Sequence, residues 1–420
     1  MKRQRLVLLL VITFCCLTIL IPGGVMAADK VFKLGIMAPM TGPSGKSGTD
    51  MKNGATMAIE KAGNKIGDYK IEMVYIDDQS DPVKATSALS EAIERQGVQA
   101  VIMNWNTSVT IATMDVFAKY KIPFFFAIGC SQSVNEKWNA QPPSDRYLII
   151  KGWPMPQKMV TGYVDCLNNA IEKGLWKPTK KLVAFYGEDN DWGRNVAQGM
   201  SAGMKAKGWE VFTEEYFAAT QTDFYPFLNK CKQAGVTVLM GSSTGVASTA
   251  ALVKQAKEVG LKAVLAADGM GWAGDWYKLM GPASDGVLDM IQQIASPGQK
   301  AFAEEYKKKY GSEPSPSAAG HAYDYANYLL KIAKTTIEKT GKLDSQSLFK
   351  IGVEEVQTGK LTYSAAEGAL FQKKYGTTPQ DVPDPKISPD DWYLPVIQYN
   401  GGVGKIVFPE SEKQTDMTFN

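Results

Sequence analysis

Polar side chains gather in two loops that each follow a short apolar run. The run Ala100–Met103 leads into Asn104–Ser108, and the run Ile122–Ile128 leads into Gly129–Ser133. Both loops offer hydroxyls and backbone N–H groups at the start of a helix or turn, which suits an anionic group such as a carboxylate. One hydroxyl of the first loop is expected to cap the helix that follows, which leaves the other free to contact a ligand.

A third loop carries a single carboxylate. Asp268 follows the apolar run Ala263–Ala267 and opens the flexible turn Gly269–Trp272. A carboxylate in this position can pair with an ammonium group of a ligand. The three loops together predict a site for a small molecule of the amino-acid type.

The loop at residues 38–48 contains Gly45-Lys46-Ser47, which invites comparison with a phosphate-binding loop. That motif requires a glycine five residues before Gly45, where this sequence has Met40. We therefore expect a flexible, hydroxyl-rich loop that faces the ligand, and no nucleotide cofactor.

Catalysis is not indicated. Hydrolysis needs a nucleophile beside a base, and the sequence has one histidine, His321, and no Gly-x-Ser-x-Gly elbow. No Gly-x-Gly-x-x-Gly fingerprint follows the first predicted strand of either half, so we expect no nicotinamide cofactor. Without a second imidazole or clustered thiols we expect no metal site, and we interpret His321 as a residue on a helix surface. The sequence predicts a binding protein and not an enzyme.

The first 28 residues have the layout of a secretory signal peptide. Lys2, Arg3 and Arg5 precede the apolar run Leu6–Ile21, and small residues at 25–28 predict cleavage after position 27 or 28. Removal of this leader takes away three basic residues and no acidic one, which lowers the formal net charge from +3 to zero. Because the leader directs export, we expect a periplasmic protein. A neutral chain is also a poor candidate for binding nucleic acid.

Three cysteines follow the leader: Cys130, Cys166 and Cys231. Such an odd and sparse set is not a disulfide framework. One bond, for example between Cys166 and Cys231, stays open.

Apolar runs and amphipathic helical patterns alternate along the chain, which predicts parallel α/β sheets. A first series ends near residue 128, and after a proline-rich stretch at 142–156 the alternation begins again. About 390 residues are also too many for one ordinary core, so we expect two α/β lobes with a ligand cleft between them. The predicted strands are 31–37, 71–76, 100–103, 122–128, 182–186, 211–217, 236–240, 263–267 and 394–399.

Five motifs, in this order and spacing, resemble the periplasmic leucine/isoleucine/valine-binding protein family over nearly the whole chain after the leader. They are Gly35–Gly42, Asp77-Asp78 with Asp81-Pro82, Gln255-Ala256 with Gly260-Leu261, Tyr323-Asp324, and Gly401–Gly404. The resemblance implies two doubly wound parallel-sheet lobes joined by three crossovers, the type I periplasmic-binding fold. We expect the first lobe to comprise residues 29–148 plus 284–353 and the second 149–283 plus 354–420.

The resemblance also implies which residues contact the ligand. Ser108 and Ser131 match the hydroxyl residues that hold the main-chain groups of an amino acid, and Asp268 matches the acidic residue that meets its ammonium. The second-lobe loop 241–245 lacks the aromatic residues of leucine-binding relatives, and tryptophans are available nearby instead. Gly129 and Cys130 are expected to contribute backbone contacts, and Ser47 lies at the cleft wall. The full predicted set is Ser47, Trp105, Ser108, Gly129, Cys130, Ser131, Trp153, Asp268 and Trp272, with Trp192 as a weaker candidate.

The expected function is therefore the solute-binding component of an ABC importer that captures an amino acid, of branched-chain type or a related carboxylate or amide, by closure of the cleft. Its partners are expected to be the small molecule and the membrane permease subunits, with the protein acting as a monomer. Two alternatives stay open. The protein could be a sensor that docks on a membrane receptor, or its ligand could be an amide, urea or an aromatic acid.

Overall fold

The computed structural model describes residues 30–273 and 276–419, and the predicted leader lies outside them. No helix in these two ranges is long and apolar enough to cross a membrane. The fold below concerns the unit Val31–Asn420, which contains two large sheets.

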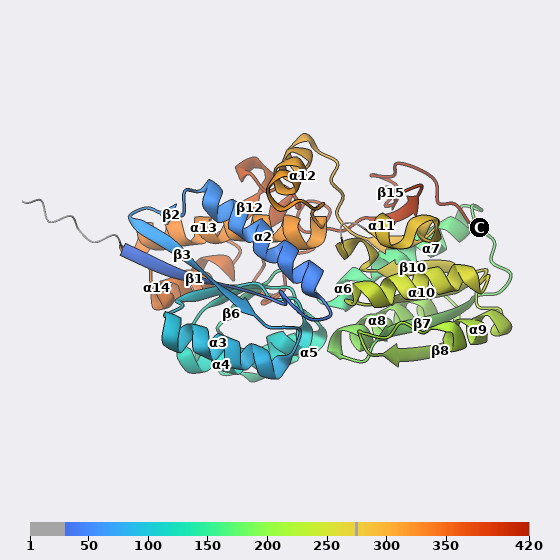
Figure 1. The fold of residues 1–420 in the computed structure, drawn as a ribbon, viewed down its shortest axis with the longest axis horizontal. Helices are drawn as coiled ribbons and strands as arrows, with labels where there is room; N and C mark the ends of the chain where they lie inside the picture. Colours follow the sequence, from blue (N-terminus) through green and yellow to red (C-terminus); the bar gives the residue numbers. More distant parts are fainter. Residues whose placement is uncertain (1–29, 274–275, 420) are drawn as a thin grey trace, which may run out of the picture. The chain divides into compact units, whose positions relative to one another are not determined.

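The first sheet has the strand order β2-β3-β1-β4-β5-β6 and is parallel apart from the β2–β3 hairpin. Helices α2 and α13 cover one face, and α3 and α4 cover the other (Figure 1). The strands are β1 (Lys30–Ala38), β2 (Lys65–Ile66), β3 (Tyr69–Asp77), β4 (Ala100–Ile102), β5 (Phe124–Ala127) and β6 (Leu148–Lys151), and the helices are α2 (Gly45–Lys61), α3 (Pro82–Gln96), α4 (Thr107–Tyr120) and α13 (His321–Thr340).

The second sheet has the order β15-β14-β11-β10-β9-β7-β8, with parallel pairing from β8 to β11 and an antiparallel hairpin, β14–β15, at one edge. Helices α7 (Thr161–Glu172), α8 (Asp191–Ala206), α9 (Tyr225–Ala234) and α10 (Val246–Glu258) belong to this half. Its strands are β7 (Leu182–Glu188), β8 (Glu210–Phe217), β9 (Val238–Ser242), β10 (Val264–Asp268), β11 (Leu288–Met290), β14 (Val396–Asn400) and β15 (Val403–Phe408).

Local sequence explains these elements. All four residues of β5 are buried aromatic or alanine side chains, as a strand covered on both faces requires. Helix α3 begins where the Asp81 carboxylate accepts hydrogen bonds from the N–H groups of Val83 and Lys84. It ends at Gly97, whose φ of +74° provides the left-handed C-cap. The prediction of two doubly wound α/β lobes is confirmed.

The strand pairing differs from the predicted lobe boundaries at two places. Strand β6 pairs with β5 in the first sheet, although residues 149–151 were assigned to the second lobe. Strand β11 pairs with β10 in the second sheet, although residues 284–290 were assigned to the first. We propose that the crossovers begin after β6 and β11, since alternation along a sequence shows where strands lie but not which partners they pair with.

The prediction that His321 lies on a helix surface is wrong. Its side chain is fully buried in the first turn of α13, and its ring centroid lies 5.2 Å from that of Trp153 and 6.0 Å from that of Trp392. Burial lowers the pKa of His321 to about 3. Phe371, Gln372 and Tyr375 cover this side of α13, and they come from a distant part of the chain that a local helical pattern does not reveal.

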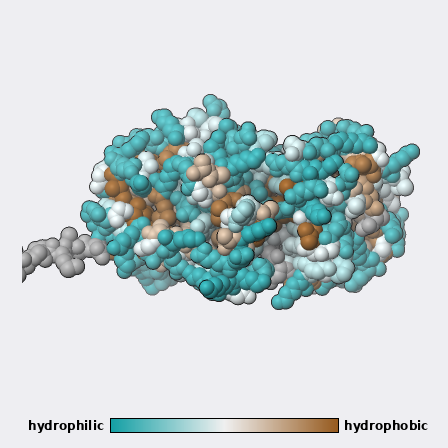
Figure 2. Space-filling model, turned by 90° about the horizontal axis from the view of Figure 1, so that it is seen from above, coloured by the Kyte–Doolittle hydropathy of each residue, from teal (hydrophilic) through white to brown (hydrophobic). Residues whose placement is uncertain are grey.

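Cys166 and Cys231 are both buried free thiols, as is Cys130. The disulfide left open by the sequence is therefore not present. Within residues 30–273 and 276–419, no group of three or more His, Cys, Asp or Glu side chains could hold a metal ion. The face shown in Figure 2 is mainly hydrophilic, with small separate hydrophobic patches, as is usual for a folded protein in water.

Candidate functional site

The loops at the carboxyl ends of six strands meet between the two sheets. Each contributes to the lining of one cavity of about 20 Å³, which is room for about one water molecule. In chain order, the loops after β4, β5, β6, β7, β9 and β10 supply Trp105, Asn106, Thr107, Ile128, Trp153, Asn190, Trp192, Thr244 and Trp272. This is the position where parallel α/β sheets bind ligands.

Four tryptophans dominate the cavity, and all four are buried. The ring of Trp105 meets that of Trp272 edge to face, with centroids 5.3 Å apart, and this contact joins the two halves across the cavity. Trp192 lies 6.0 Å from Trp272 on the second half. Such ring faces and edges suit a flat, apolar solute body.

The polar atoms of the cavity that have no partner are mostly donors. The indole N–H groups of Trp105 and Trp272 are buried without an acceptor. The indole N–H of Trp192 donates instead to Ser242 Oγ at 2.9 Å. Helix α4 begins at Thr107 with no side-chain cap, so its first N–H groups add to the donors, while the Asn106 Oδ1 is an acceptor without a partner. The cavity therefore favours a solute group rich in acceptor oxygens.

A buried carboxylate outside the cavity fixes two of the lining residues. Glu188, at the end of β7, accepts hydrogen bonds from Thr244 Oγ1 at 2.9 Å and from Asn190 Nδ2 at 2.7 Å. It also accepts from the N–H of Gly245 at 2.9 Å and from the Ser243 hydroxyl at 3.0 Å. These bonds hold the loops after β7 and β9 in one fixed relation to each other.

Asp268 is buried and does not line the cavity. Its Oδ1 accepts a hydrogen bond from the Tyr163 hydroxyl at 2.9 Å. Burial, with a smaller contribution from the charge of Asp289, raises the pKa of Asp268 to about 7, against the hydroxyls of Ser242 and Tyr163. In this conformation the Oδ1 of Asp268 is bonded to Tyr163 and its Oδ2 is buried without a hydrogen-bond partner, so its contact with a ligand stays a prediction.

Some of the predicted site residues line the cavity and others do not. Trp105, Trp153 and Trp272 line the cavity, as does the weaker candidate Trp192. The residues that do not line it are Ser47, Ser108, Gly129, Cys130, Ser131 and Asp268.

Three of these residues form hydrogen bonds, through their backbone groups, with residues in or beside the loops that line the cavity. Ser131 donates its N–H to Thr107 Oγ1 at 3.4 Å, and the carbonyl of Gly129 accepts from Thr110 Oγ1 at 2.9 Å. The carbonyl of Cys130 accepts from Lys151 Nζ at 2.8 Å. They therefore support the cavity from one layer behind it.

Five lining residues were not predicted: Asn106, Thr107, Ile128, Asn190 and Thr244. Asn106 and Thr107 lie in a loop that the sequence identified, but Ser108 was preferred over them by resemblance. The signal that would have found all five is their common position one to five residues after a strand end. That signal includes too many other loop residues to select these by sequence.

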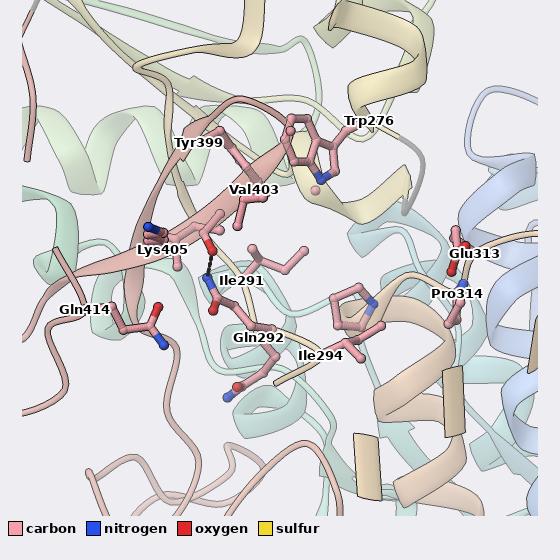
Figure 3. Close-up of a pocket in the computed structure, with 16 residues that line it drawn as sticks. Trp276, Ile291, Gln292, Ile294, Glu313, Pro314, Tyr399, Val403, Lys405 and Gln414 are labelled. Carbon is pink, nitrogen blue, oxygen red and sulfur yellow. Dashed lines mark hydrogen bonds between the residues drawn. The ribbon is translucent and has the colours of Figure 1, made fainter. Parts of the chain in front are cut away.

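A larger, open recess of about 550 Å³ is lined by residues that include Trp276, Ile291 and Tyr399 (Figure 3). Gly271 lines this recess and its neighbour Trp272 lines the cavity, so the 3₁₀ turn η2 (Met270–Ala273) separates the two. In the recess the ring of Trp276 packs on Tyr399 with centroids 4.0 Å apart, and Gln293 Nε2 donates to the carbonyl of Gly404 at 2.7 Å.

Comparison with known proteins gives consistent results. The family model described as periplasmic binding protein matches residues 31–379. The Leu/Ile/Val-binding protein homolog 8 of Brucella abortus (strain 2308) is 27% identical over 312 residues, which cover 70% of this chain and 73% of that protein.

Two solved structures share the fold at low identity. The branched-chain amino acid transporter substrate-binding protein LivJ of Streptococcus pneumoniae, in complex with isoleucine, has a TM-score of 0.68 and 19% identity over 89% of this chain and 98% of its own. A solute-binding protein of an ABC transporter from R. palustris, in complex with 4-hydroxybenzoate, has a TM-score of 0.71 and 20% identity over 93% and 98% of the two chains.

Proposed function

Since this chain belongs to the periplasmic binding protein family and is a substrate-binding protein of ABC transporter type, we propose that the solute it captures is a small carboxylate with a flat, apolar body, such as an aromatic acid. The family is a solute-binding family and not an enzyme family. We further propose that the chain is exported to the periplasm, acts as a monomer and delivers its solute to membrane permease subunits.

The composition of the cavity carries this proposal. Four tryptophans line it, and none of the nine residues that line it is acidic or basic. A buried ammonium needs an anionic partner, and a cavity of this kind offers none. A carboxylate fits the cavity better, because the indole N–H groups of Trp105 and Trp272 have no acceptor and the start of α4 has no side-chain cap, so all of them are available to donate to its oxygens.

The amino-acid ligand predicted from the sequence depends on Asp268. That carboxylate lies behind the cavity and is bonded to Tyr163. Relatives of this fold have been solved with isoleucine and with 4-hydroxybenzoate, so the fold accommodates both kinds of solute. The tryptophan lining favours the second kind here.

Closure around the solute is the proposed mechanism. The cavity of about 20 Å³ is far smaller than any aromatic acid, so the solute enters when Trp105 and Trp272 are apart. Closure then forms contacts across the site, including the hydrogen bond from the Ser44 hydroxyl to the carbonyl of Thr244 at 3.4 Å. A solute that binds the closed state more tightly shifts the population toward it, and the permease reads that state.

The test is a thermal-shift and calorimetry screen of the mature protein against benzoate, 4-hydroxybenzoate, benzamide and isoleucine. A true ligand raises the melting temperature by mass action. We expect the two acids to bind at least tenfold more tightly than benzamide and isoleucine. Tighter binding of isoleucine would reject the aromatic acid and restore Asp268 as an ammonium partner. Tighter binding of benzamide would show that the site selects a neutral group.

A further inference from the structure

The turn that carries Trp272 is built around a second buried carboxylate, Asp289 on β11. Asp289 Oδ1 accepts from the N–H of Gly269 at 3.0 Å, and Oδ2 accepts from the N–H of Gly271 at 2.7 Å. Oδ2 also accepts from the Tyr399 hydroxyl at 2.9 Å, and Oδ1 from the N–H of Met290 at 2.8 Å. Two of these four bonds are donated by the turn and one by the adjacent strand β14, so the carboxylate acts as an internal anion that organises the turn.

The two glycines of the turn are there because of these contacts. A Cβ on Gly271 would lie 2.4 Å from the Tyr399 hydroxyl oxygen and 3.0 Å from Asp289 Oδ2, so only glycine lets the backbone approach the carboxylate. A Cβ on Gly269, whose φ is +93°, would lie 2.5 Å from the ring of Trp272. The turn therefore presses against Asp289 on one side and holds the indole ring on the other.

We propose that Asp289 is a positioning residue for solute binding: its carboxylate fixes η2 so that Trp272 forms one wall of the cavity and meets Trp105 across it. This inference rests on the proposed function of the cavity but concerns a residue that does not touch the cavity. Asp289 is fully buried and lies among the residues beneath the turn. Its effect on the solute passes through Trp272.

The effect of Asp289 on the position of Trp272 is expected to depend on pH, because other ionisable groups surround its carboxyl. Asp268 faces it from β10, Tyr399 from β14, Tyr163 from α7 and Tyr186 from β7. Burial raises the pKa of Asp289 to about 6. Protonation removes the charge that attracts the N–H groups of the turn, so acidification from pH 7.5 to 5 is expected to loosen Trp272.

Acrylamide quenching of tryptophan fluorescence tests the inference without any ligand. The signal of Trp272 is the difference between a protein and its W272F variant, measured in the wild-type background and in D289N. We expect the quenching constant of Trp272 to rise at least twofold in D289N, and to rise in the wild type on acidification. An unchanged constant in both cases would overturn the proposal.

Asp324→Asn is the matched control. Asp324 is also fully buried, and it accepts from the N–H groups of Leu370 and Phe371 and from the Tyr375 hydroxyl; none of these four residues lines the cavity. We expect D324N to lower the melting temperature as D289N does, yet to leave the quenching of Trp272 unchanged. Equal effects of both variants on Trp272 would show general loosening and reject a positioning role.

Solute affinity provides a second, separate readout. With 4-hydroxybenzoate as the probe, we expect D289N to raise Kd at least tenfold and D324N to change it less than twofold. If Asp289 acts through Trp272, then D289N adds little to W272F in a double-mutant cycle. Fully additive effects would contradict the inference. If the wild type binds none of the four solutes, the proposed function fails, while the quenching experiment still decides the role of Asp289. If D289N does not fold, Y399F removes only one of the four hydrogen bonds and is expected to show the same change in weaker form.

Discussion

Acidification is expected to stabilise this protein between pH 7.5 and 5.5, because several buried carboxyl groups take up protons in the folded state. Burial raises the pKa values of Asp78, Asp268 and Asp324 to about 7, and that of Asp289 to about 6, from an ordinary value of 3.8. A carboxyl with a raised pKa binds protons in the folded state before the unfolded state does. The free energy of unfolding therefore rises as the pH falls through these values.

The size of the effect follows from the shifts. Over this interval each of the three carboxyls with a pKa of about 7 contributes roughly 2 kcal/mol, and Asp289 contributes roughly 1 kcal/mol. His321 acts in the opposite direction, since burial lowers its pKa to about 3 and the unfolded state binds a proton first. It removes roughly 1 kcal/mol. The net gain is on the order of 6 kcal/mol as an upper bound.

The assay is urea unfolding followed by circular dichroism at pH 7.5, 6.5 and 5.5. We expect the free energy of unfolding to increase at each step, and the D324N variant to show an increase smaller by roughly 2 kcal/mol, since one carboxyl no longer titrates. A free energy that is flat or falls toward pH 5.5 would refute the reasoning. It would mean that these carboxyls stay ionised in the fold at neutral pH.

Three substitutions test other parts of the structure. Trp105→Ala removes one wall of the cavity and is expected to weaken binding of 4-hydroxybenzoate by about 1–3 kcal/mol, measured by calorimetry; unchanged affinity would place the site elsewhere. Asp384→Asn leaves the fully buried Lys151 without its anionic partner, and a loss of about 3–5 kcal/mol in urea unfolding is expected; a loss below about 1 kcal/mol would show that this ion pair contributes little to the stability of the fold. Asp81→Ala removes the N-cap of α3 and is expected to lower the free energy of unfolding by about 1 kcal/mol, as is typical for the loss of such a cap. An unchanged free energy of unfolding would show that Pro82 fixes the start of the helix without the cap.

The buried ion pair also bears on closure. Lys151 ends β6, where the first crossover leaves the first sheet, and Asp384 belongs to the segment that returns toward β14. Lys158 lies 3.1 Å from the same carboxylate and 2.9 Å from that of Asp381. We propose that this group of charges restricts how the two lobes move relative to each other, because it links the end of β6 to the segment before β14.

The sequence by itself determined the elements and the class of fold. Strands such as β5 are apolar throughout because both faces are covered. Helices such as α3 have capping residues, here Asp81 and Gly97, that mark their ends in the sequence. These signals are local, so they are complete in a window of ten to fifteen residues. The resemblance of short motifs then supplied the family, which the comparison of residues 31–379 confirms.

Only the tertiary structure decided which strand-end residues line the cavity. Asp268 and Trp272 are four residues apart in one loop, yet Asp268 points into the interior toward Tyr163 and Trp272 forms the cavity wall. The difference is made by Asp289, which lies 21 residues after Asp268 and holds the turn between them from an adjacent strand. A sequence shows that a carboxylate and an indole stand near a strand end. Which one lines the cavity depends on the charges and rings packed behind them, and those come from distant segments that only folding brings together.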